Sequence, residues 1–148
     1  MTADGDPQEF TLIAVASELA VRDILLALRS RLSAHGVSDD TCGSVELAMA
    51  EALNNIVEHA YAGEQSRDIR LSVSIKPERL CCHVRDGGAP LPDLCLPQGG
   101  LPDPSGPRND LPEGGFGWFL IRALTERVTY ERRDGMNHLT LEFLHSGA

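Results

Sequence analysis

The sequence has little positive charge. Its 148 residues carry 13 Lys and Arg against 22 Asp and Glu, a formal net charge of -9, and Lys76 is the single lysine. An acidic chain repels the phosphate backbone of nucleic acids over long range, although it can still bind a small phosphorylated ligand. We therefore expect no nucleic-acid partner.

Long apolar runs are also lacking. No stretch of about 18 uncharged apolar residues occurs, and residues 1–9 are acidic and polar, unlike the basic start of a secretion signal. We expect neither membrane insertion nor secretion, and hence a cytoplasmic protein. The length and the apolar content of 42% are typical of one domain with one sizeable core.

The four cysteines have no C-x-x-C spacing. Cys81 and Cys82 are adjacent in a predicted strand and point to opposite faces, while Cys42 and Cys95 lie elsewhere in the sequence. We interpret all four as reduced thiols. The alternative is that Cys81, Cys82 and His83 supply ligands to a metal ion. Because the sequence offers no second pair of ligands, no zinc site is predicted.

Two common nucleotide-binding loops are missing. There is no G-x-x-x-x-G-K-[ST], and Lys76 falls in a predicted strand far from any glycine-rich loop. There is also no G-x-G-x-x-G between a strand and a helix. These absences exclude a Walker-type site and a Rossmann dinucleotide site.

What is present is a regular succession of apolar patterns. They predict the order strand, helix, helix, strand, strand, loop, helix, strand, strand. The predicted strands cover 10–15, 68–76, 80–84, 128–132 and 136–144, and the predicted helices cover 17–36, 38–61 and 116–124. Ser17 and Ser38 start the first two helices, and Asp134-Gly135 is a strong hairpin signal. Because strands that can pair follow one another, we predict an α+β fold: a two-layer sandwich whose mixed, mostly antiparallel sheet has its helices on one face.

The segment 87–115 differs from the rest of the chain. Seven glycines and seven prolines fall within it, which prevents regular structure over most of its length. A loop this long in a compact domain is usually functional or disordered. We expect it to belong to a single folded domain over 10–144, preceded by a flexible N-terminus over 1–9.

A row of polar side chains lies on the second predicted helix. Glu51, Asn55 and His59 are spaced i, i+4 and i+8, which places them on one side within reach of one ligand. The alternative is an ordinary solvated helix face. Asn54 and Asn55 count against that alternative, because Asn is a poor residue for a helix interior. A carboxylate can act as a base and an amide oxygen suits Mg²⁺, the two parts that phosphoryl transfer needs.

Both ends of the long loop carry short glycine motifs. Asp86 ends a strand just before Gly87 and Gly88, where a buried carboxylate could accept a hydrogen bond from an amine such as that of adenine. The alternative is a plain Asp-Gly turn. At the other end, Gly115 and Gly117 open the third helix, whose N-terminal backbone N–H groups would face an anion.

Together these motifs resemble those of a known family. In order, Glu51 to Tyr61, Asp86 to Gly88, Gly115 to Ile121 and Thr140 look like the N box, G1 box, G2 box and terminal threonine of the GHKL ATPases, which have the Bergerat ATP-binding fold. The resemblance covers about residues 10–144. The form E-A-x-x-N-x-x-x-H-A-Y is similar to that of the anti-sigma-factor serine kinases of partner-switching systems.

The resemblance implies ATP and Mg²⁺ as cofactors and assigns roles to matching positions. Glu51 would be the general base and Asn55 the Mg²⁺ ligand. Asp86 would bind the adenine amine, Gly88 would lie against the base, and Thr140 would support the contact between Asp86 and adenine.

The remaining assignments concern the phosphate end of the site. Gly115 and Gly117 would let the loop over 87–115 close as a lid. Asn54 and His59 would complete the phosphate end. Arg108 is the only cation of the lid and could contact the γ-phosphate, or could equally be a solvated arginine.

Three functions are compatible with these features. The resemblance implies a kinase that phosphorylates a serine or threonine of an anti-anti-sigma (STAS) partner and sequesters a sigma factor, commonly as a homodimer. The second is an interaction module that uses nucleotide only to set its shape. The third is a detached histidine-kinase catalytic domain, which is disfavoured because the sequence has no room for a phosphoacceptor helix hairpin.

Overall fold

The predicted order of elements is confirmed in the computed structural model, which describes residues 8–62, 67–97 and 115–145. The strands are β1 Gln8–Val15, β2 Asp68–Ile75, β3 Arg79–Asp86, β4 Arg127–Arg133 and β5 Met136–Leu144. The helices are α1 Glu18–Ala34, α2 Asp39–Asn55, the π-helical turn η1 Ile56–Ala60, the 3₁₀ turn η2 Pro92–Leu94 and α3 Gly115–Leu124.

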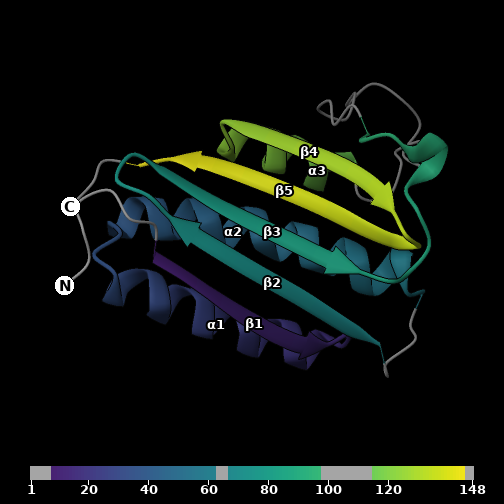
Figure 1. Cartoon of the computed structure of the whole chain (residues 1–148), viewed down its shortest axis with the longest axis horizontal. Helices are drawn as coiled ribbons and strands as arrows, with labels where there is room; N and C mark the ends of the chain where they lie inside the picture. The colour runs from purple at the N-terminus through teal and green to yellow at the C-terminus, as the bar shows by residue number, and fades with distance from the viewer. Residues whose placement is uncertain (1–7, 63–66, 98–114, 146–148) are drawn as a thin grey trace.

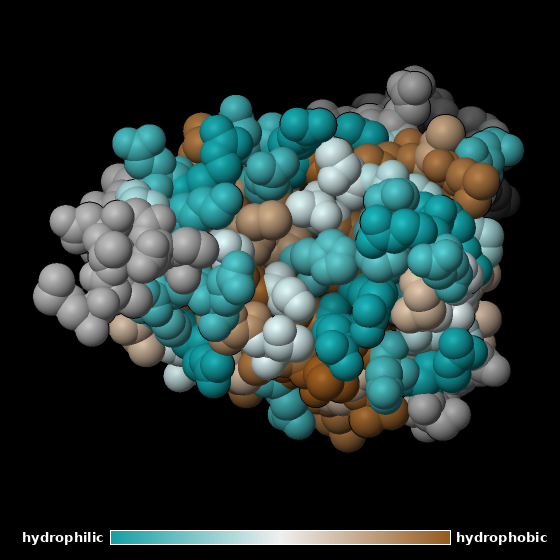
Figure 2. Space-filling view, viewed as in Figure 1, coloured by the Kyte–Doolittle hydropathy of each residue, from teal (hydrophilic) through white to brown (hydrophobic). Residues whose placement is uncertain are grey.

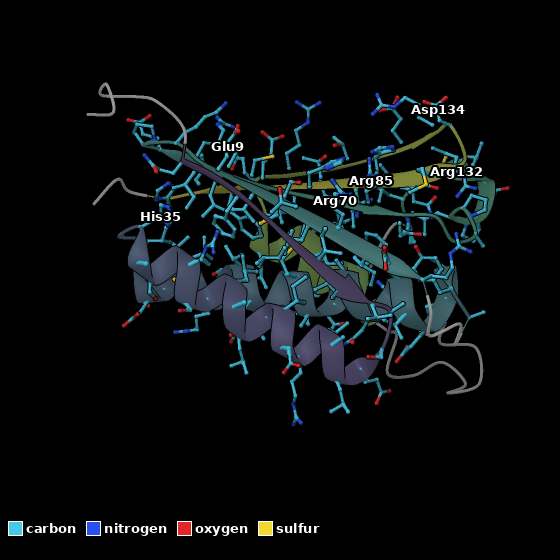
Figure 3. The ribbon with its side chains drawn as sticks, turned by 60° about the horizontal axis from the view of Figure 1, so that its bottom comes forward. Glu9, His35, Arg70, Arg85, Arg132 and Asp134 are labelled. Atoms are coloured by element: carbon cyan, nitrogen blue, oxygen red, sulfur yellow. The ribbon has the colours of Figure 1, made fainter. Side chains whose placement is uncertain are left out.

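The five strands form one sheet in the order β1-β2-β3-β5-β4, and each neighbouring pair in the described chain is antiparallel. All three α-helices lie behind this sheet in Figure 1. After a rotation of 60° they are seen together beneath it in Figure 3. The predicted α+β fold with helices on one face is therefore confirmed. No helix of the described chain covers the other face of the sheet, which is called the open face below.

The core fills the space between the sheet and the helices. On β3 every second residue is buried, namely Leu80, Cys82 and Val84, and these side chains face the helices. On α2, Met49 and Leu53 are fully buried. Alternation along the strands thus assigns each strand residue either to the helix-covered face or to the open face.

Local signals fix the ends of the helices. Ser17 Oγ accepts a hydrogen bond from the backbone N–H of Ala20 at 3.1 Å, and Ser38 Oγ accepts one from Thr41 at 3.2 Å. Gly36, just beyond α1, has φ of +83°, a conformation that favours glycine. The N-caps predicted from sequence are confirmed.

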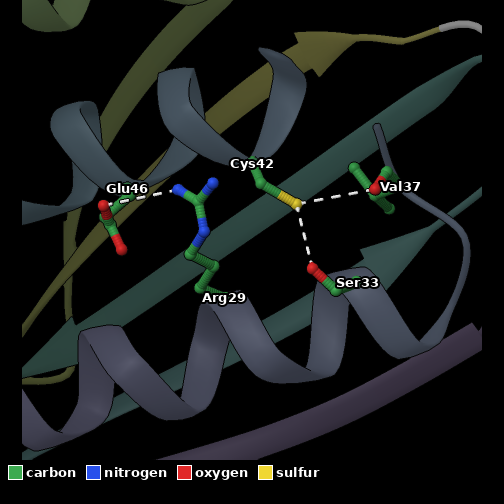
Figure 4. Close-up of polar contacts among 5 residues, drawn as sticks. All are labelled: Arg29, Ser33, Val37, Cys42 and Glu46. Carbon is green, nitrogen blue, oxygen red and sulfur yellow. Dashed lines mark hydrogen bonds and ion pairs between the residues drawn. The ribbon is translucent and has the colours of Figure 1, made fainter. Parts of the chain in front are cut away.

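Helices α1 and α2 are held together by packing and by a few polar contacts (Figure 4). The Cys42 thiol donates to the carbonyl of Val37 at 3.6 Å and lies 3.9 Å from Ser33 Oγ. Arg29 and Glu46 form an ion pair at 3.5 Å. Because both charged groups are partly exposed, that pair adds little stability, and the buried apolar stripe of α1 is the main attachment.

Several boundaries differ from those predicted. Strand β1 already begins at Gln8, while residues 1–7 lie outside the described residues. The second helix is not α-helical up to Tyr61, because η1 replaces its last turn. Of the long loop, residues 98–114 lie outside the described residues. Within the described part, no helix is long and apolar enough to cross a membrane.

Truncation of Leu53 tests the importance of this core. Leu53→Ala removes a fully buried side chain and should lower the free energy of unfolding by about 2–5 kcal/mol. Leu47→Ala, on the same helix but 56% exposed, is the matched control and should change it by less than about 0.5 kcal/mol. Urea unfolding followed by circular dichroism measures both. Equal losses of stability in the two variants would contradict the conclusion that α2 buries Leu53 and exposes Leu47.

Candidate active site

A buried carboxylate lies where β3 ends. Asp86 is only 3% exposed and faces the helices. Its Oδ1 atom accepts hydrogen bonds from the backbone N–H of Gly88 and from Nδ2 of Asn137, both at 2.9 Å. Among the described residues all hydrogen bonds to Asp86 end on Oδ1, so Oδ2 can accept one from a ligand.

The pKa of Asp86 is raised above its ordinary value, chiefly because burial disfavours the charged form. The hydrogen bonds from Asn137 and Gly88 lower the pKa, as do the charges of Arg132 and Arg67, but burial is the larger effect. A buried carboxylate that is incompletely compensated gains from any further donor. The site is therefore suited to an N–H donor such as an exocyclic amine.

Asn137, which the sequence reasoning missed, takes the place expected for Thr140. On β5 the residue paired with Asp86 is Asn137, whereas Thr140 pairs with His83. Asn137 is 5% exposed on the helix-covered face, and Thr140 lies on the open face, so Thr140 cannot support Asp86. The signal was present in the alternation, because Asn137 is an even number of residues from the apolar Leu139 and Leu141.

A hydrogen-bond network fixes Asn137. Its Oδ1 atom accepts from the hydroxyl of Tyr130 at 2.6 Å and from Arg132 at 3.0 Å. Its Nδ2 atom also donates to the carbonyl of Ala89 at 2.8 Å, and Arg132 donates to the carbonyl of Gly88 at 2.7 Å. Strands β4 and β5 thus hold the first residues of the long loop beside Asp86.

Tyr61 holds the same loop from the helix side. Its hydroxyl accepts from the backbone N–H of Gly87 at 2.7 Å and donates to the carbonyl of Asp68 at 2.6 Å. Gly88 lies against the backbone of η1, where a Cβ would be only 2.4 Å from the carbonyl oxygen of Ala60. Any side chain at Gly88 would push the loop away from the helix, which is the physical reason for glycine here.

Glu51 and Gly117 meet across α2 and α3. A Cβ on Gly117 would lie 2.5 Å from Oε2 of Glu51, so the absence of a side chain leaves room for the carboxylate. Glu51 itself is partly buried. The structure thus brings together one residue of the first motif and one residue of the third, which lie 66 positions apart in the sequence, at 51 and 117.

Asn55, one turn after Glu51, has an unsatisfied amide. Its Nδ2 atom is buried and has no hydrogen-bond partner among the described residues. Buried polar groups are normally paired, so an orphaned amide needs an explanation, and a missing ligand is one. The Asn55 amide can donate a hydrogen bond to a phosphate oxygen. After rotation by about 180° around its last side-chain bond, its oxygen can instead coordinate a hard cation.

The π-helical turn changes the predicted row of side chains. Because η1 begins directly after Asn55, the regular i+4 spacing ends before His59. His59 is exposed, with its Nε2 4.0 Å from Glu58, and Asn54 is exposed as well. Glu51 and Asn55 therefore lie together in a partly buried region, whereas Asn54 and His59 lie on the surface.

The remaining assignments concern the loop that follows Asp86. Gly115 is the first residue of α3, one residue before the predicted start at 116, and Arg108 lies outside the described residues. Before the undescribed part, the loop is tied down at Pro97, whose carbonyl accepts two hydrogen bonds from Arg122 of α3 at 3.2 and 2.8 Å.

Fold and site agree with one family of proteins. The profile of the histidine kinase-like ATPase domain matches residues 14–143, and the chain belongs to that family. Membership implies the use of ATP. The orphaned amide of Asn55, the space that Gly117 leaves at Glu51 and the available oxygen of Asp86 fit an adenine nucleotide with a hard cation.

Relatives with similar sequences are named as protein kinases. The chain is 35% identical over 117 residues to the serine/threonine-protein kinase BtrW of Bordetella bronchiseptica, covering 78% of this chain and 76% of that protein. It is 29% identical over 139 residues to the serine-protein kinase RsbW of Halalkalibacterium halodurans, covering 93% and 85%.

Solved structures show the same fold at low identity. The RsbU and RsbW domains of Rv1364c from Mycobacterium tuberculosis match with a TM-score of 0.65 and 19% identity, covering 95% of this chain but only 34% of that longer chain. The histidine kinase domain of the blue-light activated kinase EL346 from Erythrobacter litoralis matches with a TM-score of 0.53 and 17% identity, over 84% of this chain and 59% of that one.

Replacement of Asn137 tests the network around Asp86. Asn137→Ala removes a donor that lowers the pKa of Asp86, so this pKa should rise further. A raised carboxyl pKa in the folded state means that stability is lost as pH rises through that pKa. The destabilisation should therefore be about 1.5–3 kcal/mol near neutral pH. It should be smaller near the ordinary aspartate pKa of about 4.

Urea unfolding at the two pH values measures this difference. Thr140→Val is the control and should change the free energy of unfolding by less than about 0.5 kcal/mol at both. A larger effect of Thr140→Val than of Asn137→Ala would mean that Thr140, and not Asn137, supports the site.

Proposed function

We propose that the chain is an ATP-dependent protein serine/threonine kinase of a partner-switching system. The observation that carries this proposal is the contact between Glu51 and Gly117 beside the orphaned amide of Asn55, on the same face of the sheet as Asp86. The names of the relatives BtrW and RsbW support the reaction class.

In this proposal the nucleotide is held at two ends. Asp86 accepts a hydrogen bond from the adenine amine through Oδ2, while Asn137 and the N–H of Gly88 hold Oδ1 in place. Asn55 supplies the amide oxygen for Mg²⁺. When bound, Mg²⁺ with ATP supplies the transferable phosphoryl group and neutralises its charge.

Glu51 acts as the general base for the attacking hydroxyl. A carboxylate positioned beside the phosphate end accepts the proton of a serine or threonine of the partner. The hydroxyl oxygen forms the new bond to the γ-phosphorus while the bond from that phosphorus to the bridging oxygen breaks, and ADP leaves with the electron pair. Gly117 lets α3 approach Glu51 closely, so the base is sited between two helices. The packing of both helices against the core restricts its movement.

The proposed partners follow from the same branch of the family. The acceptor is an anti-anti-sigma (STAS) protein, and the unphosphorylated acceptor competes with a sigma factor for this chain. The chain acts as a homodimer in the cytoplasm, with Gly115 and Gly117 at the base of a lid over 87–115. Arg108, Asn54 and His59 contribute to the phosphate end in the closed form.

Replacement of Asp86 tests nucleotide binding. Asp86→Asn exchanges an acceptor oxygen for an amide, so the affinity for ATP with Mg²⁺ should fall at least about tenfold, or 1.4 kcal/mol. Calorimetry measures this, with Asp68→Asn, an exposed residue at the start of β2, as the control. If the wild-type chain binds no ATP, the nucleotide site is refuted.

Replacement of Glu51 separates catalysis from binding. Glu51→Gln keeps the size of the side chain but removes the base, so phosphate transfer should fall by about 10²–10⁴-fold while ATP affinity stays within about twofold. Glu58→Gln, on the exposed side of the following turn, is the matched control and should keep full activity.

The readout is radiolabel transfer from ATP to STAS-domain proteins of the same organism. If no such protein is labelled although the wild type binds ATP, the chain is a nucleotide-dependent interaction module and not a kinase. Label on His59 of this chain would instead favour histidine-kinase chemistry.

A further inference from the structure

The open face of the sheet carries basic side chains in neighbouring positions. Arg70 on β2 is directly opposite Arg85 on β3, and Arg85 is opposite His138 on β5. His83 lies two residues before Arg85 and therefore shares its face. Figure 3 shows Arg70 and Arg85 on the side of the sheet away from the helices. Figure 2, from the same side as Figure 1, shows mainly hydrophilic residues across this face.

Within the described residues, nothing neutralises the two arginines of this group. Neither Arg70 nor Arg85 has an ion pair or a hydrogen bond within the part of the chain that the structure describes. Elsewhere on this face Arg79 and Arg127 share Glu142, at 3.7 and 4.0 Å. Like charges directly opposite each other destabilise a sheet. The chain has an excess of acidic residues, yet this repulsive pair of arginines lowers the stability of the sheet and makes no compensating ion pair with a described residue.

A hollow lies over β3, β4 and β5, and two of its lining residues, His83 and His138, are the neighbours of Arg85 on the open face. Its volume is about 530 Å³. Its lining offers hydroxyls, imidazoles and a guanidinium, with one carboxylate, and the lining residues are His83, Thr129, Tyr130, Glu131, Arg133, His138 and Thr140. Glu131 is paired with Arg133 at 3.7 Å. The hollow therefore presents polar groups next to Arg85, whose charge no described residue neutralises.

Two of the residues that line this hollow are histidines in contact with each other. Nε2 of His83 lies 3.1 Å from Nδ1 of His138, and the rings are stacked with centroids 5.2 Å apart. The pKa of His83 is lowered, first by burial and then by His138, Arg85 and Arg133. Among the described residues no group of three metal-ligating side chains occurs, so the pair is not explained by a metal site.

We propose that this basic surface, formed by Arg70, Arg85, His83, His138 and Arg133, binds an acidic segment of a partner protein. Arginine forks and imidazole N–H groups pair well with carboxylates. A nucleic acid is disfavoured because the net charge of -9 repels a densely charged backbone at long range, whereas a short acidic segment brings few charges.

The basic surface is independent of the proposed nucleotide site. Asp86 and Asn137 face the helices, whereas Arg85 and His138 are their neighbours in sequence and face the opposite way. A partner bound on the open face leaves the helix-covered face accessible. One end of the β3–β5 pair thus carries both sites, one on each face of the sheet.

Binding of a labelled acidic peptide to the full chain tests the proposal. The probe is a fluorescein-labelled peptide of Glu, Asp and Gly, measured by anisotropy in moderate salt. The double variant Arg70→Ser with Arg85→Ser should weaken binding at least tenfold. Arg22→Ser with Arg29→Ser, on α1, changes the net charge equally and should alter it less than twofold.

A second readout uses the histidines. Burial lowers the pKa of His83, so its protonation, which adds positive charge to the surface, should raise the affinity for the peptide only as pH falls below the ordinary histidine range. His83→Gln with His138→Gln should remove this rise. The charged groups facing the pair are Arg70, Arg85, Arg133 and Glu131. The three arginines disfavour protonation of His83, whereas Glu131 favours it.

Three outcomes would overturn the proposal. They are no peptide binding by the wild type, equal losses in both arginine double variants, and tighter binding of a single-stranded oligonucleotide than of the peptide. ATP affinity is measured in parallel and should be unchanged in the Arg70 and Arg85 variant. Failure of the basic surface is thereby distinguished from failure of the nucleotide site.

Discussion

The burial of the Asp86 carboxylate is the constraint on which the site depends. A carboxylate that is only 3% exposed is stable as a charged group only when hydrogen-bond donors contact it. Strand β5 supplies one such donor, the side-chain amide of Asn137. Asn137 is in turn fixed by Tyr130 and Arg132, which also hold the start of the long loop. One buried charge thus determines the position of the loop and of the oxygen that faces a ligand.

The sheet separates two chemistries. Its helix-covered face combines an apolar core with a few buried polar groups at one end, where Asp86 and Asn137 are placed by strand alternation. Its open face carries charge, and Arg70 and Arg85 are next to each other there although nothing in the described chain neutralises them. Residues adjacent in sequence, such as Asp86 and Arg85, therefore belong to different sites.

The fold explains how motifs distant in sequence come together. Packing of α2 against α3 brings Glu51 and Gly117 into contact, and the close approach of the loop to η1 requires glycine at position 88. The change from α to π geometry after Asn55 turns His59 to the surface while its neighbour Ala60 receives the loop backbone. Small residues at these two contacts let helices and loop approach each other closely.

The sequence by itself determined the order of elements, the helix caps and the position of Asp86 at a strand end, because periodicity and capping are local properties. The tertiary structure decided which residue lies beside Asp86. A motif match favoured Thr140, but pairing of β3 with β5 selects Asn137, since one face of a strand holds only every second residue. The π turn, the buried amide of Asn55 and the pairing of Arg70 with Arg85 likewise depend on contacts between strands and helices far apart in the chain, which no local pattern contains.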